Sequence, residues 1–188
     1  MQDLRRQAEA TPPLIAGEQA ALLEQAAHGN RKSQSRLVAS RLEMVIRLAE
    51  ARRDRGLSVS DLVMEGSLGL VEAIQSFIGG GEPDFDAFAE RKTGEQMDAA
   101  LAEEAAARRE AEHLVTAATD YERTEVLLWR ELHRAPTDAD IAEKLEWTVE
   151  RTRYIAATVA EARRRHDEEL LAFIDPDAVE VDDMADGE

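Results

Sequence analysis

Apolar and polar positions follow the period of an α-helix along most of this chain. The clearest apolar stripe lies between Ser58 and Phe77, at positions spaced four, three, four and three residues apart: Val63, Ser67, Leu70, Ile74 and Phe77. Ser58 and Asp61 open this stretch as an S-x-x-D motif, whose hydroxyl and carboxylate can each satisfy a free backbone N–H. We therefore predict a helix here that packs along the stripe and turns acidic residues outward, namely Asp61, Glu65 and Glu72.

The rest of the chain also reads as helices and turns. Residues 1–13 are polar, end in two prolines and are expected to form a loose lead-in. Two helices should follow, separated at Gly29-Asn30, and the second of them should end near a C-cap at Gly56. Because no stretch shows the alternation of a strand, the sequence predicts an all-α protein.

A helix-turn-helix pattern lies further along the chain. Pro136 ends one helix, Thr137 and Asp140 form a second capping box, and Thr148 can cap the helix that follows. The two short helices would join at Glu146-Trp147. The same motif serves either as a DNA reader or as plain packing, and three acidic residues favour packing: Glu143, Glu146 and Glu150.

The charge balance restricts the function. The chain has 188 residues and a net charge of −17, whereas proteins that bind DNA phosphates need a basic surface. Eight basic residues stand against three acidic ones between 31 and 55, and ten acidic residues with no basic one lie between 167 and 188. With no cysteine, no apolar run of membrane length and no signal peptide, we expect a soluble cytoplasmic protein that does not enter a membrane.

Catalytic and metal-binding signatures do not stand out. The glycines at 79–81 lack the strand and the Lys-Ser/Thr pair of a phosphate-binding loop. Four histidines are scattered without a second ligand at helical spacing: His28, His113, His133 and His166. We expect no enzyme activity, no cofactor and no metal.

The string DLVMEGSLGLVEAIQSF at 61–77 resembles the DLIQEGNIGLMRAVEKF pattern of the bacterial sigma-70 family. The match includes two glycines inside a helix, and each costs about 1 kcal/mol relative to alanine. In that family the helix belongs to the second region and docks on the clamp coiled coil of the RNA polymerase β′ subunit. The resemblance implies that the same contact is made here by Asp61, Met64, Glu65, Ser67 and Val71.

The resemblance extends over most of the chain. GEQAALLEQAAHGN and SRLVASRLEMVIRLAEARRDRGL, both before residue 58, are similar to the opening helices of sigma factors. The resemblance to sigma factors implies three parts after the N-terminal lead-in. These are a region-two-like bundle at 14–112, a region-three-like three-helix domain at 113–165 and an acidic finger-like tail at 166–188. We do not expect the fourth region of the family, which reads the minus-35 element, and a partner is one candidate for supplying that recognition.

The DNA-melting helix of the family aligns without a gap after Phe77. Its exposed aromatics stack on flipped promoter bases, and Phe85 and Phe88 fall on two aromatic positions of the pattern. Arg91 and Lys92 stand where paired aromatics belong, and ten acids outnumber four bases between 82 and 112. We expect only weak DNA binding through these four residues.

Two functions of different class remain open. In the first, the protein is a divergent sigma factor that docks on the polymerase core and assists promoter opening. In the second, it is a sigma mimic that occupies the polymerase, or sequesters an anti-sigma factor, without reading DNA. Exposure of Phe88, Arg91 and Lys92 would favour the first function, and burial of Phe85 and Phe88 the second.

Overall fold

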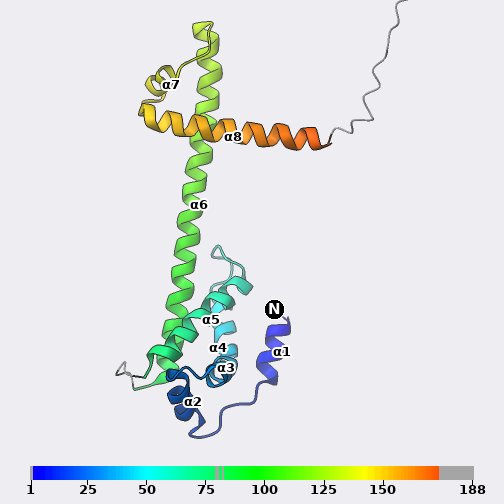
Figure 1. The fold of residues 1–188 in the computed structure, drawn as a ribbon, viewed down its shortest axis with the longest axis vertical. Coiled ribbons are helices and arrows are strands. Elements are labelled where there is room, and N and C mark those ends of the chain that lie inside the picture. The colour runs from blue at the N-terminus through cyan, green and yellow to red at the C-terminus, as the bar shows by residue number, and fades with distance from the viewer. Residues whose placement is uncertain (1, 79–80, 82, 174–188) are drawn as a thin grey trace, which may run out of the picture. The chain divides into compact units, whose positions relative to one another are not determined.

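The computed structural model describes residues 2–78, 81 and 83–173, except for the side chains of residues 7, 172 and 173. Every regular element in this part of the chain is an α-helix, which confirms the predicted all-α class (Figure 1). The elements are α1 Gln2–Ala10, α2 Glu18–Ala27, α3 Arg31–Ser40, α4 Leu42–Glu50, α5 Val59–Ser76, α6 Phe85–Leu132, α7 Asp138–Leu145 and α8 Val149–Phe173.

The chain divides into two compact units, Met1–Arg108 (unit 1) and Arg109–Glu188 (unit 2). The boundary lies inside α6, so this one helix contributes its first half to unit 1 and its second half to unit 2. The sequence places the corresponding boundary between 112 and 113, within the same helix.

Helix α5 forms the centre of unit 1. The Ser58 hydroxyl accepts a hydrogen bond from the backbone N–H of Asp61 at 3.1 Å and thereby caps the helix as predicted. Its inward face buries Leu62, Val63, Gly66, Gly69, Leu70, Ala73 and Ile74. Three residues of the predicted stripe belong to this set, Val63, Leu70 and Ile74, whereas Ser67 and Phe77 are half-buried.

The two glycines of α5 are explained by the close approach of α6. A Cβ added at Gly69 would lie 2.8 Å from the backbone oxygen of Lys92 and 2.7 Å from the Cβ of Gln96. At Gly66 it would lie 2.0 Å from the Cε of Met97. At Gly69 only a residue without a side chain allows the two helices to pack at this distance, whereas at Gly66 the end of the Met97 side chain fills the space of a Cβ. The close contact at Gly69 outweighs the low helix propensity of glycine.

Two predictions for the first half of unit 1 were wrong. The loose lead-in expected at 1–13 contains α1, because Leu4 and Ala8 pack against the core. The single helix expected up to Gly56 is broken at Arg41, which has φ −113° and ψ 6°, and its second part, α4, ends at Glu50. Arg41 directs its side chain to Gln19 and Asp86, so the break coincides with a contact to α2 and to α6.

Unit 2 is formed by the second half of α6 together with α7 and α8. Its small core joins Tyr121 and Leu128 of α6 to Ile141 of α7 and to Ile155 and Val159 of α8. Burial raises the pKa of the Tyr121 phenol above its ordinary value.

The predicted caps of unit 2 are confirmed. The capping box of Thr137 and Asp140 starts α7, and Thr148 Oγ1 accepts the backbone N–H of Arg151 at 3.2 Å in the first turn of α8. Glu146 adopts the left-handed conformation at the turn, with φ 56° and ψ 36°. Helix α8 continues to Phe173, past the predicted domain end at 165, while the rest of the predicted finger-like tail lies outside the described residues.

Candidate functional site

The outward face of α5 carries an exposed apolar pair. Met64 and Leu68 lie four residues apart, hence on the same side of the helix, and are 59% and 57% exposed. Asp61 and Glu72 are exposed beside them, and Glu65 is half-buried. We call these five residues the α5 face; they combine an apolar centre with an acidic border.

The five residues predicted for polymerase docking are only partly brought together. Asp61, Met64 and Glu65 lie on the α5 face, and Glu65 Oε2 accepts a hydrogen bond from Gln96 Nε2 of α6 at 3.0 Å. Ser67 and Val71 lie at its margin and are half-buried. The Ser67 hydroxyl donates to the backbone oxygen of Val63 at 2.7 Å, which turns it back onto the helix.

Leu68 was missed by the sequence reasoning. The available signal was its position: it is a large apolar residue four positions after Met64 and off the buried stripe. On a helix whose opposite side forms the core, such a residue is exposed, and an exposed apolar pair framed by charges is typical of a protein-binding surface.

The two predicted stacking residues are buried. Phe85 and Phe88 are 3% and 8% exposed, and both rings pack on Phe77, with centroid distances of 5.2 and 5.7 Å. In this conformation neither ring can stack on a base, which needs a free π face. Both rings complete the core of unit 1, which is the burial expected of a protein that does not read DNA through them. Weak DNA binding through Phe85, Phe88, Arg91 and Lys92 stays a prediction.

The two predicted cations next to these rings have internal partners. The Arg91 guanidinium lies 5.2 Å from the centre of the Phe88 ring and donates to Glu95 Oε1 at 3.0 Å. Lys92 Nζ lies 3.7 Å from Glu95 Oε2. The hydrogen bond from Arg91 lowers the pKa of the Glu95 carboxyl below its ordinary value.

The basic segment at 31–55 meets a row of acids on α6. Each pair joins residues more than 40 positions apart in the sequence, and the nitrogen–oxygen distances range from 2.6 to 3.3 Å. The pairs are Arg41–Asp86, Arg47–Glu90, Arg52–Asp98 and Arg55–Asp98. We call them the arginine row; its positive charge is balanced within the chain, so it offers phosphate groups much less than the sequence count indicates.

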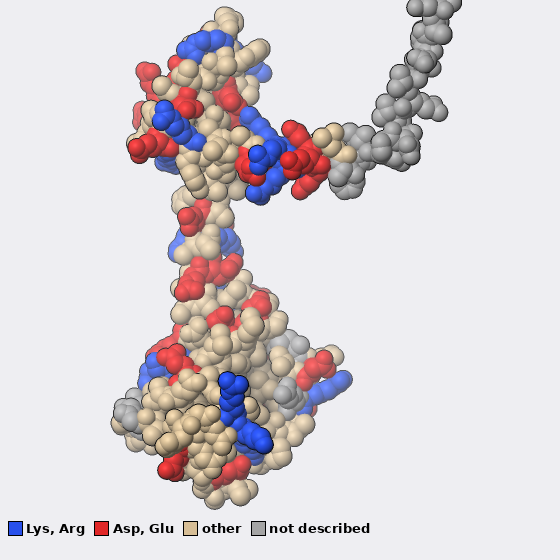
Figure 2. Space-filling view, viewed as in Figure 1, with Lys and Arg blue, Asp and Glu red and all other residues tan. Residues whose placement is uncertain are grey.

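Two arginines of the helix-turn-helix also have partners within the chain, one an aromatic ring and the other a carboxylate. The Arg151 guanidinium lies 4.4 Å from the centre of the Trp147 ring, and Arg153 Nε lies 3.3 Å from Asp138 Oδ2. On the face of the molecule drawn in Figure 2, basic side chains are interspersed with acidic ones and form no continuous basic surface.

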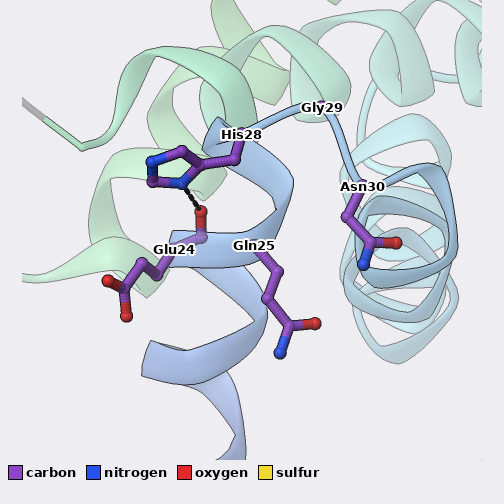
Figure 3. Close-up of a pocket in the computed structure, with 5 residues that line it drawn as sticks. All are labelled: Glu24, Gln25, His28, Gly29 and Asn30. Carbon is purple, nitrogen blue, oxygen red and sulfur yellow. Dashed lines mark hydrogen bonds between the residues drawn. The ribbon is translucent and has the colours of Figure 1, made fainter.

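A hollow of about 520 Å³ lies at the turn between α2 and α3 (Figure 3). His28 Nδ1 is 2.8 Å from the backbone oxygen of Glu24, and Asn30 Oδ1 accepts the N–H groups of Lys32 and Ser33. These polar groups build the turn and leave no convergent set for a ligand. Nowhere in the described part of the chain do three or more His, Asp or Glu residues gather as a metal site, and no described helix is long and apolar enough to cross a membrane.

Comparison with known proteins identifies the family. The chain is 35% identical over 127 residues to RNA polymerase sigma factor SigA of Synechocystis sp., which covers 68% of this chain and 30% of that protein. The SigA proteins of Microcystis aeruginosa and Mycoplasma genitalium are each 34% identical, over 69% and 59% of this chain and over 31% and 22% of their own lengths. The matched part of the chain belongs to the sigma-70 family.

This membership agrees with the resemblance carried by residues 61–77. A comparison of the chain with sequence models of protein families, in contrast to the comparison with individual proteins, finds no match. The chain spans about a third of the length of the first two of these relatives and less of the third, so their names describe proteins with much additional sequence.

Proposed function

We propose that this chain is a sigma-70-like transcription initiation protein that binds the core of bacterial RNA polymerase through the α5 face. The observation that carries the proposal is the exposed Met64–Leu68 pair, held between acids on a helix whose other side is fixed in the core. The family resemblance gives the partner surface as the clamp coiled coil of the β′ subunit.

The chemistry of the α5 face fits such a partner. Burial of two large apolar side chains contributes roughly 1.5–3 kcal/mol each and can form the centre of an interface. Asp61 and Glu72 on the border favour a basic partner surface, and charges in such positions raise the association rate and orient the partner. The affinity would therefore come mainly from Met64 and Leu68, and the orientation from the acids.

A second candidate function is a sigma mimic that occupies the polymerase, or sequesters an anti-sigma factor, without reading DNA. Two observations favour it: the burial of Phe85 and Phe88 in the core, and the arginine row that is neutralised by α6. Under this proposal, DNA contact by Phe85, Phe88, Arg91 and Lys92 does not occur while unit 1 is folded as described.

The polymerase proposal is tested by measuring binding to purified core RNA polymerase. The variant Met64→Ala/Leu68→Ala should bind at least about tenfold more weakly, which corresponds to about 1.4 kcal/mol. Glu72→Arg should mainly slow association. A double variant at exposed apolar residues outside α5, Ile15→Ala/Val115→Ala, is the matched control and should bind like the wild type. Equal binding by both double variants would refute docking through the α5 face.

The two candidate functions are separated by a promoter-opening assay. Core polymerase with this chain is added to a duplex promoter that carries a fluorescent base analogue in the minus-ten element, with and without a protein that supplies minus-35 recognition. Opening that depends on this chain would support the sigma factor. Polymerase binding without opening in either mixture, together with competition against a second sigma factor, would support the mimic.

A further inference from the structure

Helix α1 lies in an apolar groove of unit 1 and fills it only in part. The helix packs on α3 and α4, and its half-buried residues Leu4 and Ala8 are four positions apart on one side. Its other described side chains are exposed. An isolated helix of nine residues is marginal in water, so the helical form of α1 depends on this contact.

Hollows remain on both sides of α1. Beside Leu4 lies a hollow of about 420 Å³, whose lining includes Val38 and Leu42. Beside Ala8 lies one of about 360 Å³, whose lining includes Ile46. Both hollows are open to solvent, and each is lined by α1 together with residues of the groove, so α1 leaves part of the groove surface uncovered.

The groove is continuous with the margin of the α5 face. Val71, at that margin, lines the same hollow as Leu4. We define the α1 groove by Val38, Leu42, Ile46 and Val71. A partner that covers the α5 face and continues past Val71 therefore meets Leu4 next.

The attachment of α1 is weak at the helix and firm at the chain that follows it. Arg5 forms an ion pair with Glu50; the Arg5 side chain is exposed and that of Glu50 is half-buried, so this pair contributes little. Arg36, in contrast, donates to the backbone oxygens of Pro12 and Pro13 at 2.9 and 3.2 Å. With its C-terminal end held in this way, α1 can leave the groove without disturbing α2.

We infer that α1 is a displaceable cover and that the α1 groove is a second part of the polymerase-docking surface. The inference rests on the proposed function. The occupant that replaces α1 is an amphipathic helix with apolar residues four positions apart and a basic residue beside them, since Leu4, Ala8 and Arg5 show which side chains the groove accepts. Helix α4 contributes the acids Glu43 and Glu50 to the lining, and its one basic residue there, Arg47, is paired with Glu90, so the lining favours a basic helix.

The first experiment tests displacement without polymerase. In Leu4→Glu the charge faces the groove, whereas in the control Ala10→Glu the same charge is placed on an exposed position of α1. Hydrogen exchange of residues 2–10 should become at least about tenfold faster in Leu4→Glu and stay unchanged in the control. A fluorescent peptide with the sequence of residues 1–12 should bind the Leu4→Glu chain more tightly than the wild type. Unchanged exchange in Leu4→Glu, or no peptide binding, would overturn the inference.

The second experiment tests the link to polymerase. Leu4→Glu should bind core RNA polymerase about three- to tenfold more tightly than the wild type, because the groove no longer has to be vacated. If the wild type binds and Leu4→Glu binds equally or more weakly, the inference that α1 is a displaceable cover is refuted, whereas the proposed function is not affected. If neither protein binds the core, the proposed function itself fails, and the inference fails with it.

Discussion

Arg52 of the turn after α4 and Asp98 of α6 form a two-pronged ion pair. Arg52 Nε donates to Asp98 Oδ1 at 3.0 Å and Arg52 Nη2 donates to Asp98 Oδ2 at 2.8 Å, although the residues are 46 positions apart. This geometry is the strongest form of the arginine–carboxylate contact. It lowers the pKa of Asp98 and raises that of Arg52, in both cases chiefly through the hydrogen bonds.

Replacement of Asp98 should therefore destabilise unit 1. Asp98→Asn removes the charge that Arg52 and Arg55 share, and because the site is partly exposed we expect a loss of about 1 kcal/mol in the free energy of unfolding. Urea denaturation followed by circular dichroism measures it. Glu103→Gln, an exposed acid further along α6, is the control. A loss of equal size in both variants would contradict a specific role for the pair.

Gly69→Ala should destabilise the protein although alanine is the better helix former. The new methyl group would meet the backbone oxygen of Lys92, which cannot move aside as a flexible side chain can. Overpacking costs roughly 1–3 kcal/mol, against a gain in helix propensity of about 1 kcal/mol. Thermal unfolding should show a lower midpoint for Gly69→Ala and little change for Ser76→Ala, at an exposed position of the same helix. A higher midpoint for Gly69→Ala would contradict the close crossing.

Glu146→Gly should stabilise unit 2. Glu146 has positive φ at the turn between α7 and α8, a conformation that costs a residue with a side chain about 1 kcal/mol and glycine little. The matched control is Glu143→Gly, in the helical part of α7, which should lower stability by about 1 kcal/mol. Denaturant unfolding of the full chain, followed by the fluorescence of the tryptophans in unit 2, measures both changes. A loss in Glu146→Gly would show that the turn is not strained.

The capping box should make the stability of unit 2 depend on acid pH. The hydrogen bond from Arg134, followed by those from the Thr137 backbone N–H and hydroxyl, holds the pKa of Asp140 well below its ordinary value of 3.8. In the window below pH 3.8 the unfolded chain binds a proton at this residue that the folded chain does not. The contribution of Asp140 is therefore complete above this pH and decreases as the pH falls further.

This prediction is checked by comparing the wild type with Asp140→Asn. The difference in unfolding free energy between them should be constant at about pH 5 and above and should shrink at about pH 3. Arg134→Ala should reduce the same pH dependence, because the Arg134 hydrogen bond is the largest single cause of the shift, and the hydrogen bonds from Thr137 should keep the remainder. A difference that does not change between the two pH values would contradict the role of the capping box.

Local sequence signals predicted the elements that local contacts create. The start of α5 and the turn at Gly29-Asn30 could be read directly, since a cap and a periodic stripe act within a few residues. Helix α1 was missed because its nine residues show only two apolar positions that bury, Leu4 and Ala8, and these need a groove built by other helices.

The candidate site depends on distant contacts and was less predictable. The periodicity of α6 does not tell whether Phe85 and Phe88 face the core or the solvent. Both rings face the core because they pack on Phe77, which lies at the end of a different helix. The arginine row joins residues more than 40 positions apart, so no local pattern shows that these four arginines of the basic segment are paired with acids. The position of Leu68 four residues after Met64 can be read from the sequence. Its exposure, and hence its place in the candidate binding surface, can be predicted only once the buried side of α5 is known.

The crossing at Gly66 and Gly69 has a consequence for how the α5 face can evolve or be engineered. Because Gly69 lies against the backbone of α6 and Gly66 against the side chain of Met97, the helix cannot rotate about its own axis without a clash. One residue inserted after Gly69 would turn the following part of the helix by about 100° and bring Glu72 towards the core. Substitutions can thus change the composition of the α5 face, whereas its direction is determined on the far side of the helix, by two residues that no partner touches.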